Sequence, residues 1–124
     1  MTVTIAIKEL NELLVRHRRW SRRMAGGRRA DLSRRNLGGL DLKSVDLREA
    51  SIVGTELCGT DFSHANLSGA DLFASDLTET NLFKALLVDA DLLGATIRRT
   101  ILDGAQLDGT GFAGGLLRAA AGER

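Results

Sequence analysis

The sequence predicts a solenoid of short stacked repeats behind an N-terminal amphipathic helix. Large apolar residues recur at every fifth position from residue 32 to residue 112, a spacing that neither a half-buried strand nor an amphipathic helix produces. The segment before them has apolar residues at helical spacing instead. Because a fixed period is the signature of repeat architectures, we divide the chain into a helical leader at 1–29, a repeat region at 30–114 and a tail at 115–124.

The leader predicts one helix within residues 4–24. Its apolar stripe, spaced by three or four residues, is Ala6, Leu10, Leu13, His17, Trp20 and Met24. Gly26-Gly27 is expected to end the helix. An open solenoid end exposes unpaired backbone and apolar core, so we expect this helix to cover the first repeat turn with Trp20 as its anchor.

The repeat region keeps its register without a slip. The large positions are Leu32, Leu37, Leu42, Leu47, Ile52, Leu57, Phe62, Leu67, Leu72, Leu77, Leu82, Leu87, Leu92, Ile97, Leu102, Leu107 and Phe112. The residue two positions earlier is mostly small, and the residue just before the large one is often Asp or Asn. Since these side chains can hydrogen-bond local backbone, we assign the carboxylates to the scaffold first.

This A(D/N)LXX pattern resembles the pentapeptide repeat family over residues 30–114. The resemblance implies an all-β solenoid, a right-handed quadrilateral β-helix of about four coils, in which the large and small residues point inward. The leader, with His17-x-x-Trp20 and Gly-Gly, also resembles the segment that often precedes such repeats, which implies an N-terminal capping α-helix.

Four units per turn would stack residues twenty apart, so Thr60, Thr80 and Thr100 should form one internal ladder. Two segments fit less well. Arg35, Leu40 and Val45 occupy positions meant for small residues, so we expect residues 30–45 to be distorted or widened. The segment 116–121 is expected either to form a short helix over the last coil or to leave that end to a second subunit.

Composition indicates a cytoplasmic protein without a transmembrane segment. Cys58 is the only cysteine, which excludes an intrachain disulfide and suits a reducing compartment. No apolar run approaches a membrane span, and the order of a signal peptide is missing. Residues 1–35 hold ten basic and three acidic residues, a net charge of +7, whereas residues 36–124 carry −6. The chain thus has a basic head and an acidic body.

No catalytic constellation stands out, so we expect no enzyme, cofactor, metal site or small-molecule substrate. His17 lies on the apolar helix stripe and is expected to be packed. Cys58 and His64 fall on outward positions of neighbouring sides, and a convex rod offers them no pocket. The aspartates follow the rule of the fold and lack a calcium-binding repeat.

Apolar residues at outward positions are the main functional signal. Val53, Phe73 and Leu93 should stack on one side, and round the corner come Phe83, Leu86 and Val88. A contiguous apolar patch usually marks an interface, so we predict a scaffold that binds a protein partner or forms a homodimer. The alternative is that a C-terminal segment packs over the patch.

Two other functions stay open. Some proteins of the resembled family modulate DNA gyrase or topoisomerase by mimicking DNA, which needs an acidic outer surface. Here the outward positions hold five acidic and six basic residues, so they form no predominantly acidic surface. The second is binding of an anionic surface, DNA or lipid, by the basic helix through Arg18, Arg19, Arg22 and Arg23. Nucleic acid is disfavoured as a partner by the charge pattern.

Overall fold

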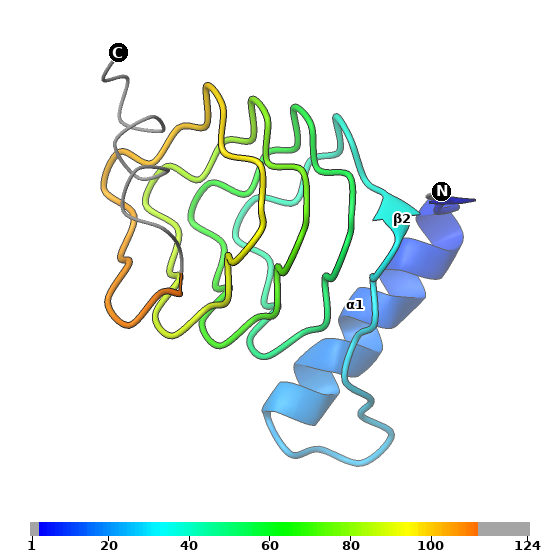
Figure 1. Ribbon diagram of the computed structural model, residues 1–124. Coiled ribbons are helices and arrows are strands. Elements are labelled where there is room, and N and C mark those ends of the chain that lie inside the picture. The colour runs from blue at the N-terminus through cyan, green and yellow to red at the C-terminus, as the bar shows by residue number, and fades with distance from the viewer. Residues whose placement is uncertain (1–2, 112–124) are drawn as a thin grey trace.

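The structure is a computed structural model that describes residues 3–111, in which a helix lies across one end of a rod of stacked coils (Figure 1). Strand β1 (Val3–Thr4) precedes helix α1 (Ile7–Ser21), and strand β2 (Arg35–Asn36) pairs with β1 in parallel. The coils follow. The predicted features that lie outside the described residues are Phe112, the end of the repeats near residue 114 and the helix at 116–121.

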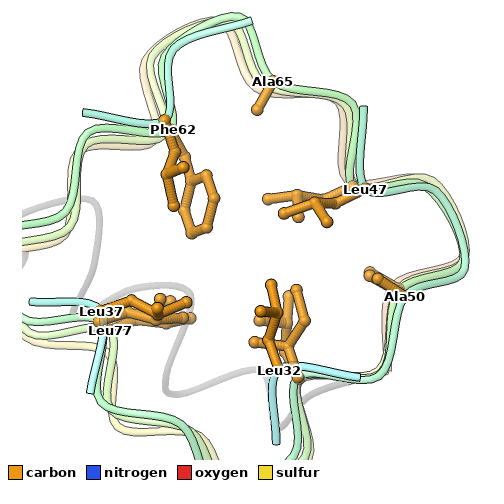
Figure 2. Close-up of a cluster of buried hydrophobic side chains, with 14 of the residues drawn as sticks. Leu32, Leu37, Leu47, Ala50, Phe62, Ala65 and Leu77 are labelled. Atoms are coloured by element: carbon orange, nitrogen blue, oxygen red, sulfur yellow. The ribbon is translucent and has the colours of Figure 1, made fainter. Parts of the chain in front are cut away.

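Each turn of the rod contains four five-residue units. Parallel bridges join residues twenty apart, from Asp31 with Ser51 through to Asp91 with Gly111, and backbone N–H groups donate to the neighbouring coil at 2.7–3.1 Å. Figure 2 looks down the coils, and we name each of the four sides after one large residue labelled there. In the order in which the chain visits them, they are the Leu32, Leu37, Phe62 and Leu47 sides. The Leu32 and Phe62 sides face each other across the core, as do the Leu37 and Leu47 sides.

The large residues of the repeat fill the inside of the rod. Every large position from residue 32 to residue 97 is buried, and Leu102 and Leu107 near the far end are half-buried. A single coil is too thin to bury such residues alone, so their burial depends on the coils above and below. The stack, not the single unit, is therefore what is stable.

Small residues and hydroxyls complete the interior. Thr60, Thr80 and Thr100 are buried and form the predicted ladder, because each hydroxyl donates to a backbone carbonyl of the preceding coil at 2.6–2.7 Å. A buried hydroxyl without a partner would cost free energy, and these bonds remove that cost. Ala50, Ala70 and Ala90 are buried at the corresponding positions of another side.

A tight turn forms each corner of the coil. At most corners the N–H of the third residue after a large position donates to the carbonyl of that large residue, as from Ala50 to Leu47 at 3.1 Å and from Ala85 to Leu82 at 3.0 Å. The residue just before the donor has a positive φ, as in a type II turn. Glycine suits this conformation, but Lys84 adopts it with φ 54° and many other corners also carry side chains there.

The Asp and Asn residues before the large positions brace the sides, as predicted. Each side-chain Oδ1 accepts a hydrogen bond from the backbone N–H two residues later, at 2.9–3.2 Å. The ten residues that do so are Asp31, Asn36, Asp41, Asp46, Asp61, Asn66, Asp71, Asp76, Asn81 and Asp91. One side-chain oxygen of each is thereby committed to the backbone.

The expectation that residues 30–45 are distorted or widened is wrong for the backbone register, which is regular in the first coil. Their bridges to the second coil follow the same twenty-residue register as the rest. Arg35 does not enter the tube, because its backbone belongs to β2 and its guanidinium pairs with Glu9 of α1 at 2.6 Å. Leu40 and Val45 are half-buried against the core. The end coil has no coil before it, so larger side chains find room there.

Helix α1 packs one face on the first coil. Leu10 and His17 are buried, and Leu13 and Leu14 are half-buried against the same core. Ile5, just before the helix, is buried as well, although the sequence did not single it out. Strand β1 adds hydrogen bonds, since the N–H of Val3 donates to the carbonyl of Arg34 at 2.9 Å.

His17, and not the expected Trp20, is the centre of this contact. The His17 ring is fully buried and its Nδ1 accepts a hydrogen bond from the backbone N–H of Ala30 at 2.9 Å. Trp20 is only half-buried and lies beside the His17 ring, with 5.4 Å between ring centroids. Met24, which the predicted stripe also included, is exposed. The histidine is thus a structural residue that fixes the return of the chain into the first coil.

The helix ends before the two glycines that were expected to stop it. Arg23 has φ 57°, its N–H donates to Trp20 O, and the next N–H donates to Arg19 O, which together make a Schellman motif. Gly27 serves a close approach instead. A Cβ placed on Gly27 would lie 2.4 Å from the backbone N of Trp20, so only glycine lets the chain fold back along the helix.

Candidate interaction surfaces

One row of apolar side chains runs up the corner between the Leu32 and Leu37 sides. Val53, Phe73 and Leu93 occupy the same position in three successive coils, and backbone hydrogen bonds of 2.8 and 2.9 Å hold the coils in register beside Phe73 and Leu93. Phe73 is 48% exposed and Leu93 is 51% exposed, whereas Val53 is half-buried. Their position needs no apolar residue, because Ser33 occupies it in the first coil. We call these three residues the Phe73 row.

Phe83 and Leu86 belong to a different surface. They flank the corner between the Phe62 and Leu47 sides, which is diagonally opposite the Phe73 row (Figure 2). Phe83 has local partners, because the His64 ring meets it edge-on at 5.6 Å and Lys84 Nζ lies 5.3 Å from its centroid. Leu86 is half-buried. Neighbours on the same corner therefore already cover part of this pair.

The six predicted interaction residues do not form one continuous patch. Val88 lies after the large residue on the Leu47 side, close to a third corner, and is half-buried. The structure thus brings Val53, Phe73 and Leu93 together and separates the other three from them. The sequence pattern placed all six on neighbouring sides, and only the four-sided register shows that the two phenylalanines lie on opposite corners.

An acidic row follows the corner between the Leu47 and Leu32 sides. Its members, spread over the coils, are Glu49, Asp71, Asp89, Asp91 and Asp108. Two basic residues lie at this corner: Arg48, whose guanidinium is engaged by Asp46 at 3.1 Å, and Arg29, which lines a shallow hollow with Glu49 and Asp71. Counting all outward charges together hid this row, because the other outward basic residues lie on other corners. Sorting the outward residues by corner would have revealed it.

The predicted basic surface lies on α1 and the loop that follows it. Arg18, Arg19, Arg22 and Arg23 are all exposed, and none of them forms an ion pair within residues 3–111. The Arg19 guanidinium donates to the carbonyl of Ala25 at 3.2 Å, which orders the loop. These side chains therefore remain available to an anionic partner.

A partly buried carboxylate, Asp46, fastens the end of α1 to the Leu47 side. Asp46 Oδ2 accepts from Ser21 Oγ at 2.6 Å and from Arg48 Nη2 at 3.1 Å. Partial burial raises the pKa of Asp46, but the hydrogen bonds from Arg48 and Ser21 outweigh it and bring the pKa to about 2. Asp46 is thus charged at neutral pH and serves the scaffold.

His17 shows the opposite response to its surroundings. Burial lowers the pKa of His17, and the nearby Asp46 carboxylate offsets only part of that effect. Nδ1 accepts from Ala30, so the neutral ring carries its proton on Nε2, which has no hydrogen-bond partner among the described residues. A proton added to Nδ1 would break the contact with Ala30.

The described residues hold no arrangement suited to catalysis or metal binding. Cys58 is an exposed free thiol, and no hydrogen bond joins it to His64, whose ring packs on Phe83. Within residues 3–111, no group of three His, Cys, Asp or Glu side chains is placed to hold a metal ion. In the same range, no helix has the length and apolar character needed to cross a bilayer.

The chain is similar to several solved structures. Rfr23, a pentapeptide repeat protein from the cyanobacterium Cyanothece 51142, is 38% identical, with a TM-score of 0.68. The match covers 69% of this chain but only 58% of Rfr23. The pentapeptide repeat protein alr5209 from Nostoc PCC 7120 is 30% identical over 97% of this chain and 96% of its own, with a TM-score of 0.49.

QnrB1, a plasmid-mediated fluoroquinolone resistance protein, is 17% identical over 77% of this chain and 69% of its own. The TM-score of this match is 0.34. A comparison with curated proteins finds no match. The family model for pentapeptide repeats matches residues 28–63, 41–78 and 75–112, with eight copies. The chain belongs to the pentapeptide repeat family, whose members fold as right-handed quadrilateral β-helices, and the resemblance seen in the sequence is thereby confirmed.

Proposed function

We propose that this protein is a non-enzymatic, cytoplasmic scaffold that binds another protein through the Phe73 row. The observation that carries the proposal is the exposure of Phe73 and Leu93 in register on successive coils. Members of the pentapeptide repeat family are protein-interaction modules, which agrees with a binding role. The partner is either a second protein or another copy of this chain.

The row has the properties of a binding surface. Phe73 is about half exposed and, within residues 3–111, has no aromatic or cationic neighbour of the kind that Phe83 has, so a partner could bury its exposed area. Covering the exposed halves of Phe73 and Leu93 would contribute roughly 2–3 kcal/mol. That is enough for an anchor at the centre of an interface whose remaining contacts are polar.

The cap supports this function by leaving the sides of the rod as the binding surface. Helix α1 and strand β1 cover the first coil, so another chain cannot add a strand at this end. In our proposal the helix therefore caps a four-coil rod and directs association to the corners, where the Phe73 row lies.

Replacing the row tests the proposal. The variant Phe73→Ser with Leu93→Ser should keep the circular dichroism of the native protein, since both side chains point outward. It should lose its partner in a pull-down, or show the monomer mass in light scattering if the partner is another copy. The matched control is Phe83→Ser with Leu86→Ser, which removes the same residue types from the opposite corner. Unchanged mass and unchanged capture by the row variant would show that the hypothesis is wrong.

The acidic row supports a second candidate, a DNA-mimicking modulator of gyrase or topoisomerase. Its five carboxylates follow one corner of successive coils, so negative charges line up along one edge of the rod, as phosphates do along a strand of DNA. This candidate predicts inhibition or protection in a supercoiling assay, weakened by Asp89→Asn with Asp91→Asn. No effect at micromolar protein would exclude it.

A further inference from the structure

Residues 16–29 form a dense arginine cluster at the C-terminal end of α1. Its seven members, all exposed, are Arg16, Arg18, Arg19, Arg22, Arg23, Arg28 and Arg29. The segment contains no acidic residue, and none of these arginines forms an ion pair within residues 3–111. So many like charges in a short segment repel one another, and no ion pair within residues 3–111 offsets that repulsion.

Apart from the hydrogen bond from Arg19 to Ala25 O, the packing of the described residues does not use these side chains. The face of α1 that packs on the first coil consists of Leu10 and His17 with half-buried leucines beside them, so the arginines occupy what remains. Figure 1 shows the C-terminal end of α1 and the loop after it reaching past the outline of the coils. The cluster is therefore presented at the edge of one end of the rod.

Apolar side chains lie among the arginines. Val15 is 51% exposed and Met24 is 53% exposed, and both line one shallow hollow of about 290 Å³ together with Arg18, Arg19 and Arg22. The hollow thus offers guanidinium groups, which bind phosphate in a bidentate manner, beside exposed aliphatic surface. The ligand that fits has phosphate and hydrocarbon next to each other.

We propose that this end of the rod binds the surface of an anionic phospholipid bilayer. The phosphate backbone of nucleic acid would engage the arginines but would gain nothing from Val15 and Met24, whereas a lipid headgroup region satisfies both. Binding stays at the interface, because the apolar face of α1 is already committed to the first coil. The site is separate from the Phe73 row, so a bound molecule would hold that row along the rod and away from the bilayer.

The distribution of charge favours one orientation on such a surface. Residues 1–35 carry +7 and residues 36–124 carry −6, so an anionic bilayer attracts the capped end and repels the coils. The acidic row runs along the rod away from that end. The rod should stand on the surface through its helix and the loop after it.

The test is co-sedimentation of the full chain with phosphatidylcholine vesicles, with and without roughly one-third phosphatidylglycerol. Wild type should bind only the anionic vesicles, with affinity that falls steeply as salt rises. Arg18→Gln, Arg19→Gln and Arg22→Gln together should weaken binding on the order of 100-fold. The matched control removes three exposed cations from the coils, as Lys43→Gln, Lys84→Gln and Arg98→Gln, and should change affinity by less than about threefold.

A second variant distinguishes lipid from nucleic acid. Val15→Ser with Met24→Ser keeps every charge and should lose most vesicle binding, while any weak binding of duplex DNA stays unchanged. Wild type that binds duplex DNA but not anionic vesicles would overturn the proposal in favour of nucleic acid. The proposal would also be overturned if wild type does not bind the anionic vesicles at low salt, or if the variant of Val15 and Met24 binds them as well as wild type does. The Phe73 and Leu93 variant should bind vesicles normally, which separates this proposal from the protein-binding one.

Discussion

Removing the charge of Asp46 should loosen the attachment of α1 to the rod by an amount that the structure sets. Asp46 accepts hydrogen bonds from Ser21 of the helix and from Arg48, and its carboxyl is 18% exposed. Its pKa falls from 3.8 to about 2, which corresponds to about 2 kcal/mol of stability at neutral pH. The variant Asp46→Asn loses the charge but keeps the oxygen that accepts from the Arg48 backbone N–H.

The sign of the pH dependence follows from the lowered pKa. The contribution is complete above the ordinary pKa of 3.8 and is lost as the pH falls toward about 2, because protons then bind the unfolded chain first. Wild type and Asp46→Asn should thus differ by about 2 kcal/mol at pH 7, and the difference should shrink below the ordinary pKa. Burial of His17 also responds to acid, so the comparison uses the difference between the two proteins at each pH.

Urea unfolding followed by tryptophan fluorescence measures this difference. Trp20 is the only tryptophan and precedes Ser21, so it reports the end of α1, while circular dichroism reports the coils. The control Asp71→Asn removes a carboxylate from the same repeat position, where Oδ1 accepts from the Phe73 N–H at 3.1 Å, and should change little. Equal stabilities of wild type and Asp46→Asn at pH 7, or a difference that does not vary with pH, would refute the reasoning.

Three further perturbations follow from the same structure. Gly27→Ala places a Cβ 2.4 Å from the backbone N of Trp20, so it should destabilise the docked helix by roughly 1–3 kcal/mol, read by a shift of Trp20 fluorescence; a native spectrum and midpoint would contradict it. Burial lowers the pKa of His17, so the stability of the protein should decline as the pH falls below the ordinary value of 6.5. His17→Leu should remove that decline in thermal melts, whatever effect the substitution has on stability at pH 8. Thr80→Val deletes the hydroxyl that donates to Leu57 O at 2.6 Å and should cost about 1 kcal/mol in urea unfolding, with no change of fold by circular dichroism.

The coils could be predicted from the sequence because their determinants are local and periodic. Leu32 and the large residues after it fix which side chains point inward, and the short-range role of Asp and Asn follows from their chemistry. The turns show the limit of such reasoning. Lys84 adopts a positive φ that its side chain disfavours, and only the register of the coils, not the local sequence, imposes that conformation.

The N-terminal cap and the surfaces depend on long-range contacts, which the sequence pattern does not encode. No pattern in the neighbouring sequence predicts that Val3 pairs with Arg35, or that the Arg35 side chain forms an ion pair with Glu9 outside the tube. The periodic stripe marked His17 and Trp20 alike, and only the return of the chain at Ala30 distinguishes the buried ring from the half-buried one. In the same way, the positions of Phe73 and Phe83 on opposite corners become clear only from the register of four units per turn.

The twenty-residue register also sets how this protein can change its length. An insertion of one whole turn lengthens the rod and leaves every later residue above the same corner, so existing surfaces persist and grow. An insertion of a single five-residue unit preserves the core equally well, because the large residues still point inward, but it rotates everything beyond it by one side. A unit inserted between Val53 and Phe73 would move Phe73 and Leu93 to the next corner, and the surface would be lost from a rod that remains fully folded.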